Sequence, residues 1–186
     1  MWQVLTGRKD GRVSFASEAE TDLPSSDANF TTLLSQFTSR GLDIIDLVTL
    51  SGAHTIGTGH CFMIANRIYN FTGNGDADPS LNPDYAKTLR TLCPISPNLT
   101  FTAEMDPQSS LSFDSHYFEA LNQNKGFFQS DAALLTDTRS VQIVRILQVP
   151  SIFFARFGES MNRMGTIGVL TGGDGEIRKN CRVVNV

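Results

Sequence analysis

One segment, Asp46–Cys61, limits the possible folds of this chain more than any other part of the sequence. It reads DLVTLSGAHTIGTGHC, so an apolar helical stretch runs up to Ser51 and delivers His54 just beyond its end. Such an imidazole can bind a metal ion through one ring nitrogen while the other nitrogen donates to a carboxylate. A histidine beside an apolar helix is more often a hydrogen-bonded core residue, by about four to one. The segment alone therefore leaves both interpretations open.

Other motifs lie along the chain in a consistent order: GRKDG from Gly7, Leu23-Pro24, Gly41-Leu42, RIYNF from Arg67, Asp78-Pro79, Cys93-Pro94, Phe113-Asp114, Ser130-Asp131, Ser160-Met161, Met164-Gly165 and GEIR from Gly175. Together with SGAHTIG they closely resemble the plant secretory (class III) haem peroxidases, over essentially the whole chain. The resemblance implies a mainly α haem-peroxidase fold. We expect residues 1–186 to be a single, N-terminally truncated domain, the proximal helical portion with long loops. In the family, the distal histidine and arginine precede the GRKDG-like motif, so we expect this chain to start after them.

The resemblance assigns roles to two residues at the proposed cofactor site. It implies that His54 is the axial iron ligand of haem b and that Asp131 accepts a hydrogen bond from its other ring nitrogen. Such a bond makes the imidazole a more electron-rich ligand, which stabilises oxidised iron. Without the resemblance, Asp131 would be interpreted as a helix cap.

A second group of residues resembles the proximal calcium loop of the family. Calcium binds six to eight oxygen atoms from carboxylates, hydroxyls and carbonyls. The resemblance implies that Thr55 and Ser109 supply hydroxyl and carbonyl oxygens, Ser112 a carbonyl, and Asp106 and Asp114 carboxylates. Taken alone, the loop would be an ordinary Asp/Ser turn. Because Thr55 follows His54 directly, bound calcium would hold the histidine in place.

The chain has three cysteines. By the family pattern, Cys61 and Cys93 form a disulfide, which would stabilise by about 3 to 4 kcal/mol in an oxidising compartment. Cys181 is then left over, and we expect a free thiol or an intermolecular bridge, since the family places its partner in the N-terminal part.

The remaining candidate residues carry weaker signals. Pro24 resembles the family position at which aromatic reducing substrates dock, although a solvent-facing turn explains it nearly as well. His60 and His116 lie where the family needs no histidine, and we expect both at the surface. Methionine and phenylalanine at helical spacing usually indicate packing, so we expect a core role for Phe62, Met63, Phe153, Phe154 and Phe157.

Charge and hydropathy exclude some partners. The formal charge is −4, which gives no basic surface for nucleic acid. No apolar run reaches the length of a membrane helix, and the first residues lack the features of a signal peptide.

Periodicity predicts a mostly helical chain without repeats. We expect helices over 28–39, 44–51, 62–69, 83–92, 113–122, 138–147 and 151–163, with Asp43 and Asn82 as the caps of the second and fourth. Residues 72–81, 94–112 and 165–180 are rich in Gly, Pro, Asn, Asp and Ser, which predicts loops.

The resemblance implies oxidation of small phenolic donors by hydrogen peroxide, in peroxide removal and the response to oxidative stress. It also implies a monomer when full length, secreted to the cell wall or apoplast or delivered to the vacuole. Without the distal groups, which act in acid–base and electrostatic catalysis, we expect this chain alone to be inactive or very weak. The alternative is a catalytically inactive haem- and calcium-binding remnant. An unrelated helical protein is the remaining hypothesis.

Overall fold

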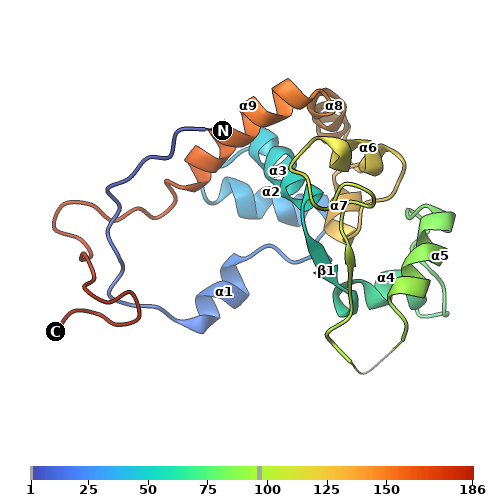
Figure 1. The fold of residues 1–186 in the computed structure, drawn as a ribbon, viewed down its shortest axis with the longest axis horizontal. Coiled ribbons are helices and arrows are strands. Elements are labelled where there is room, and N and C mark those ends of the chain that lie inside the picture. Colours follow the sequence, from blue (N-terminus) through green and yellow to red (C-terminus); the bar gives the residue numbers. More distant parts are fainter. Residues whose placement is uncertain (1, 96–97) are drawn as a thin grey trace.

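Helices dominate the architecture, as expected from the sequence. The computed structural model describes residues 2–95 and 98–186 (Figure 1). The α-helices are α1 (Ala16–Asp22), α2 (Phe30–Thr38), α3 (Ile44–Ser51), α4 (Ala65–Tyr69), α5 (Pro83–Leu92), α6 (His116–Asn122), α7 (Gln129–Ala133), α8 (Thr138–Leu147) and α9 (Pro150–Met164). Short 3₁₀ turns, η1 (Gly52–Thr55) and η2 (Cys61–Ile64), flank the strand β1 (Thr58–His60), which pairs antiparallel with β2 (Thr102–Glu104).

Polar caps and prolines fix where the principal helices begin. The Asp43 side chain accepts hydrogen bonds from the backbone N–H groups of Ile45 and Asp46 at the start of α3. Asn82 and Asp137 cap α5 and α8 in the same way. These side chains satisfy N–H groups that have no partner within the helix. The predicted helices over 44–51, 83–92 and 138–147 are confirmed with their bounds, and the other predicted helices differ from the structure at their ends.

Two hydrophobic clusters fill the interior. The larger one lies between α2, α3, α6, α8 and α9, and its fully buried members include Val48, Phe118 and Phe153. Helix α3 packs against α2, α8 and α9, so it lies at the centre of this cluster. The smaller cluster joins η2, α4, α5 and the loop before α7 through Ile68 and Phe127.

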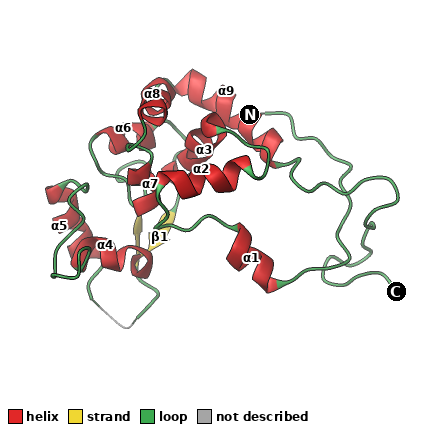
Figure 2. Cartoon of the chain, turned by 180° about the vertical axis from the view of Figure 1, so that it is seen from behind, coloured by secondary structure: helices red, strands yellow, loops and turns green. Residues whose placement is uncertain are grey.

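The two ends of the chain lie outside these clusters. Trp2 packs on Phe157 of α9, and from there residues up to 15, like residues 165–186, run as an arch away from the helical body, on the side opposite α5 (Figure 2). Isolated bridges join Lys9 to Leu170 and Asp10 to Glu176, so the two segments support each other. None of the described helices is both long and apolar enough to cross a membrane.

Part of the predicted core is wrong. Phe153 and Phe157 are buried as expected, but Phe62, Met63 and Phe154 are exposed to 53%, 42% and 41%. Phe62 stacks on His60, with ring centroids 5.4 Å apart, and contributes no buried surface to either cluster. Helical spacing groups apolar side chains on a helix, but it does not tell which of them turn toward the core.

Candidate functional site

His54 lies where the two hydrophobic clusters meet. It is held by η1, which continues from α3 without a break. Its ring makes edge contacts with Tyr117 from the larger cluster and with Phe128 from the smaller one, at centroid distances of 6.0 and 5.1 Å. Gly52 permits this turn, because a Cβ there would lie 2.6 Å from the Phe153 ring. The position of the histidine is therefore set by close aromatic packing.

The Asp131 carboxylate is the hydrogen-bond partner of His54. Its Oδ1 lies 2.8 Å from His54 Nδ1, and the Tyr117 hydroxyl donates to the same oxygen at 2.8 Å. Its Oδ2 accepts the backbone N–H of Phe128 at 2.7 Å, at the start of α7. Asp131 is thus a helix-capping residue and a histidine partner at once, and it is only 1% exposed.

Electrostatics in this pair favour charge on both partners. Burial lowers the pKa of His54, but the charge and hydrogen bond of Asp131 outweigh it, and the net shift is upward from 6.5. Burial raises the pKa of Asp131, yet the His54 charge and the hydrogen bonds from His54, Phe128 and Tyr117 lower it overall. Burial, and then the charge and hydrogen bond of Asp131, raise the Tyr117 pKa well above its usual value, so this hydroxyl stays a donor. The pair therefore holds a proton on Nδ1 next to an ionised carboxylate.

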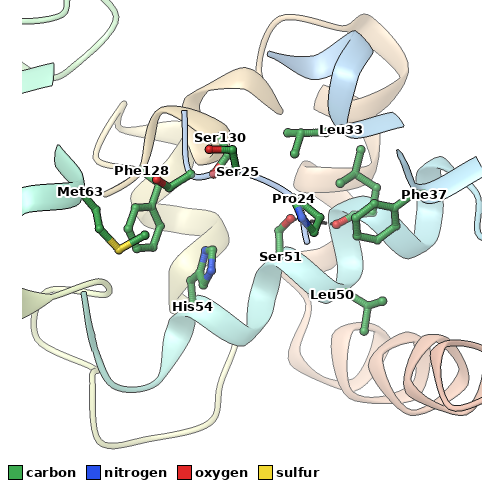
Figure 3. A pocket seen from close by; sticks show the side chains of 12 residues that line it. Pro24, Ser25, Leu33, Phe37, Leu50, Ser51, His54, Met63, Phe128 and Ser130 are labelled. Atoms are coloured by element: carbon green, nitrogen blue, oxygen red, sulfur yellow. Dashed lines mark hydrogen bonds between the residues drawn. The ribbon is translucent and has the colours of Figure 1, made fainter. Parts of the chain in front are cut away.

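A cavity of about 330 Å³ opens in front of His54 (Figure 3). Figure 3 shows the imidazole between Phe128 and Met63 on one side and Ser51 and Pro24 on the other. The rest of the lining is Ser25, Ser26, Leu33, Phe37, Leu47, Leu50 and Ser130. With Nδ1 engaged by Asp131, Nε2 is the ring nitrogen left for a ligand. An imidazole nitrogen at a mainly apolar cavity fits the axial ligation of haem.

Four of the predicted calcium residues form a cluster of oxygen atoms around Thr55, the residue that follows His54. The Thr55 hydroxyl lies 2.9 Å from Asp106 Oδ2 and 3.2 Å from Asp114 Oδ1. Ser109 Oγ donates to Asp114 Oδ2 at 2.5 Å. Thr55 and Asp106 have no measurable exposure. Two carboxylates thus converge on one hydroxyl, which has a single hydrogen to donate.

The charges in this cluster fit a hard cation. Burial raises the pKa of Asp106, and the nearby Asp114 charge raises it further, although His116 and Thr55 act in the opposite direction. Burial also acts to raise the pKa of Asp114, but hydrogen bonds from Ser109, the His116 N–H and Thr55 lower it overall. An all-oxygen donor set with two adjacent carboxylates fits calcium. Ser112 donates its N–H to the Ser109 carbonyl, and its own place among the ligands stays a prediction.

One contact at this cluster was missed from the sequence. His116, which we expected at the surface, is half-buried, and its Nδ1 lies 2.6 Å from Asp106 Oδ1. The His116 side chain is still 35% exposed, so the residue lies at the surface but with a partner that was not predicted, while His60 is exposed as expected. The ten-residue spacing of the pair gave no signal, because it follows no helical or strand period.

The cysteines and Pro24 complete the set of predicted residues. Cys61 and Cys93 form a disulfide, with Cα atoms 5.3 Å apart, and Cys181 is an exposed free thiol. Pro24 lines the same cavity as His54, 30 residues away in the sequence. Its docking role stays a prediction.

The amino-acid sequence of this chain is similar to those of known proteins. The family profile described as Peroxidase matches residues 1–149. Peroxidase 24 of Arabidopsis thaliana is 55% identical over 100% of this chain and 54% of its own length. Peroxidase 56 of the same plant is 54% identical over 99% of this chain and 56% of its own length, and Peroxidase 5 of Vitis vinifera is 44% identical over 99% and 56%. The chain thus spans about half the length of these relatives.

Proposed function

Because this chain belongs to the plant secretory (class III) peroxidase family, we propose that it forms the haem-ligating side of a hydrogen-peroxide-dependent peroxidase. The substrates would be hydrogen peroxide and small phenolic donors. One observation carries the proposal. His54 bonds an ionised, buried Asp131 through Nδ1 and leaves Nε2 for a ligand at an apolar cavity.

In this proposal His54 would hold haem b through Nε2, and Asp131 would keep the proton on Nδ1. Bound haem iron supplies the redox chemistry through which peroxide is reduced to water and donors are oxidised. The chain itself fixes the ligand. Asp131 increases the electron density of the imidazole, and Tyr117 holds the Asp131 oxygen that His54 uses. The apolar lining of Leu33 and Leu50 limits water around the ligand.

We propose that calcium binds the oxygen cluster of Thr55, Asp106, Ser109 and Asp114, with Ser112 contributing a carbonyl. The cation would neutralise two carboxylates beside the histidine and fix the backbone at Thr55. Since Thr55 follows His54 directly, this would restrict the orientation of the imidazole.

The remaining features of the proposal concern substrate and place of action. Pro24 lines the cavity and would contact aromatic donors at its edge. The Cys61–Cys93 disulfide supports an oxidising compartment, either the cell wall or apoplast or the vacuole. We propose that residues 1–186 belong to one haem-peroxidase domain, and that the protein acts as a monomer.

Steady-state oxidation of guaiacol by hydrogen peroxide tests the proposal on the purified, haem- and calcium-loaded peroxidase that contains these residues. We expect His54→Gln to abolish turnover and Asp131→Asn to reduce it about 10- to 100-fold. His60→Gln is the matched control, because His60 is exposed and does not line the cavity, and it should retain full turnover. Full activity in His54→Gln would overturn the assignment.

A further inference from the structure

The side chain of Arg67 is buried and bound to the loop that leads to Asp131. It extends from α4, and the Arg67 side chain is only 3% exposed. Its Nη1 donates to the backbone carbonyls of Gly126 and Phe127, the latter at 2.8 Å. These carbonyls belong to residues 59 and 60 positions further along the chain. A single guanidinium therefore fixes two successive peptide groups in a segment without regular secondary structure.

The other edge of the guanidinium is fixed by Asp78. Arg67 Nε lies 2.8 Å from Asp78 Oδ2, and the Asp78 side chain is 2% exposed. The N–H and hydroxyl of Ser80 donate to Asp78 Oδ1 at 2.8 and 2.7 Å. Burial raises the pKa of Asp78, but the hydrogen bonds from Arg67 and Ser80 outweigh it and lower this pKa overall. The ionised carboxylate thus holds Arg67 in the one orientation in which Nη1 reaches the loop.

The loop is in direct contact with the carboxylate that binds His54. A Cβ added at Gly126 would lie 2.7 Å from the Asp131 Cβ and 2.8 Å from Leu121 Cδ2, so the backbone passes Asp131 at the closest distance that packing allows. Two residues later, Phe128 donates its N–H to Asp131 Oδ2. Displacement of the Gly126 and Phe127 peptides would therefore displace Asp131.

We infer that Arg67 is a positioning residue for the His54–Asp131 pair: it fixes the 126–128 backbone, which sets the Asp131 carboxylate at hydrogen-bond distance from His54 Nδ1. This inference deepens the proposed function, since the pair matters for catalysis only if His54 binds haem. A buried ion pair often stabilises a fold no more than apolar residues would. The inference therefore concerns the position of the 126–128 backbone and is tested by a signal of His54 itself.

The test follows the Nδ1–H proton of His54 by NMR in the haem-free chain, so it does not depend on haem binding or turnover. Arg67→Lys keeps a charge for Asp78 but cannot bind two carbonyls and a carboxylate in one plane. We expect it to shift the His54 Nδ1–H signal in the same direction as Asp131→Asn does, and by less. In an Asp131→Asn background the same substitution should produce no further shift.

Two references make the result specific. Arg90→Lys is the matched control. Arg90 also donates from Nε to a backbone carbonyl, that of Ile68 at 2.7 Å, but this carbonyl lies outside the 126–128 loop. The Nδ1–H of His116, which contacts Asp106, is the internal reference and should stay in place in both variants.

If Arg67→Lys does not fold, Asp78→Asn removes the charge that orients Arg67 without touching the 126–128 loop, and it should shift the His54 signal likewise. A folded Arg67→Lys or Asp78→Asn protein with an unchanged His54 Nδ1–H signal would overturn the inference. An equal shift in Arg90→Lys would also overturn it. Failure of haem binding in the unchanged chain would instead contradict the proposed function and leave this test unaffected.

Discussion

At the residue scale, the chemistry depends on a small number of hydrogen bonds to buried carboxylates. Asp131 accepts three of them, and the two to its Oδ1 come from side chains, those of His54 and Tyr117. Removing one partner of a buried charged pair leaves the other without compensation. Substitutions at these buried residues should therefore lower the stability. Substitutions at exposed ion pairs, such as Lys87 with Asp84, should have little effect.

The His54–Asp131 pair predicts a pH dependence of stability in the haem-free protein. The pKa of His54 is raised above 6.5, so its contribution is complete below 6.5 and is lost as the pH rises through the folded value. The pKa of Asp131 is lowered, so its contribution is present above 3.8 and is lost as the pH falls through the folded value. The pair should stabilise most between these two limits.

Urea unfolding at about pH 5.5 and about pH 8.5 measures this effect. We expect the free energy of unfolding to fall between the two pH values by more in the unchanged chain than in Asp131→Asn. An identical fall in both proteins would show that the pair does not titrate as described.

Thr55 allows a second prediction at this scale. Thr55→Val keeps the shape of the side chain but removes the hydroxyl on which Asp106 and Asp114 converge. We expect calcium affinity, measured by isothermal titration calorimetry, to fall by about tenfold or more. Thr58→Val, on the exposed edge of β1, is the control and should bind calcium normally.

At the element scale, helix starts were more predictable than helix faces. Asp43, Asn82 and Pro150 have local capping or proline signals that need no knowledge of the rest of the fold. Helices α1 and α7 were not predicted, because α1 has no buried residue to produce a periodic pattern and α7 has only five residues. The strand β2 lies within a predicted loop. Its pairing with β1 was not predicted, because the central pair, Gly59 with Ala103, joins residues 44 positions apart.

The site was predictable to the extent that the family motif determines it. Asp131 could be assigned to His54 only through the resemblance, because 77 residues separate them and no sequence period links them. The contacts of Arg67 with Gly126 and Phe127 and of His116 with Asp106 depend on the packing of distant elements, so only the structure reveals them.

Gly52 gives the prediction that belongs to this scale. It ends α3 and begins η1, and a Cβ there would lie 2.6 Å from Phe153 Cε2 and 2.8 Å from Phe118 Cζ. Gly52→Ala should therefore force α3 away from α6 and α9 and lower the free energy of unfolding by about 1 to 3 kcal/mol. Gly173→Ala is the control, because a Cβ at Gly173 meets nothing within 4 Å. Equal stability of the two variants in urea would contradict this packing.

At the scale of the whole molecule, the disulfide and the two clusters hold the site from opposite sides. The Cys61–Cys93 bond closes a loop of 32 residues around the smaller cluster, which supplies Phe128 to the His54 cavity. Closing a loop of that length stabilises by about 3 to 4 kcal/mol in the chain-entropy model. Replacing both cysteines by serine should lower the stability by this order, whereas Cys181→Ser should change it little, because that thiol is exposed and unpaired. Urea unfolding of the two variants and the unchanged chain measures both effects. Equal stability of the two variants would contradict this account.

The central claim is that His54 binds haem iron, and a haem titration of the purified chain in calcium tests it most directly. Absorbance in the Soret region is followed for the unchanged chain, for His54→Ala, and for His60→Ala as the exposed-histidine control. We predict saturable binding with a five-coordinate spectrum in the unchanged chain and in His60→Ala, and loss of that spectrum in His54→Ala. The same saturable spectrum in His54→Ala would contradict the claim.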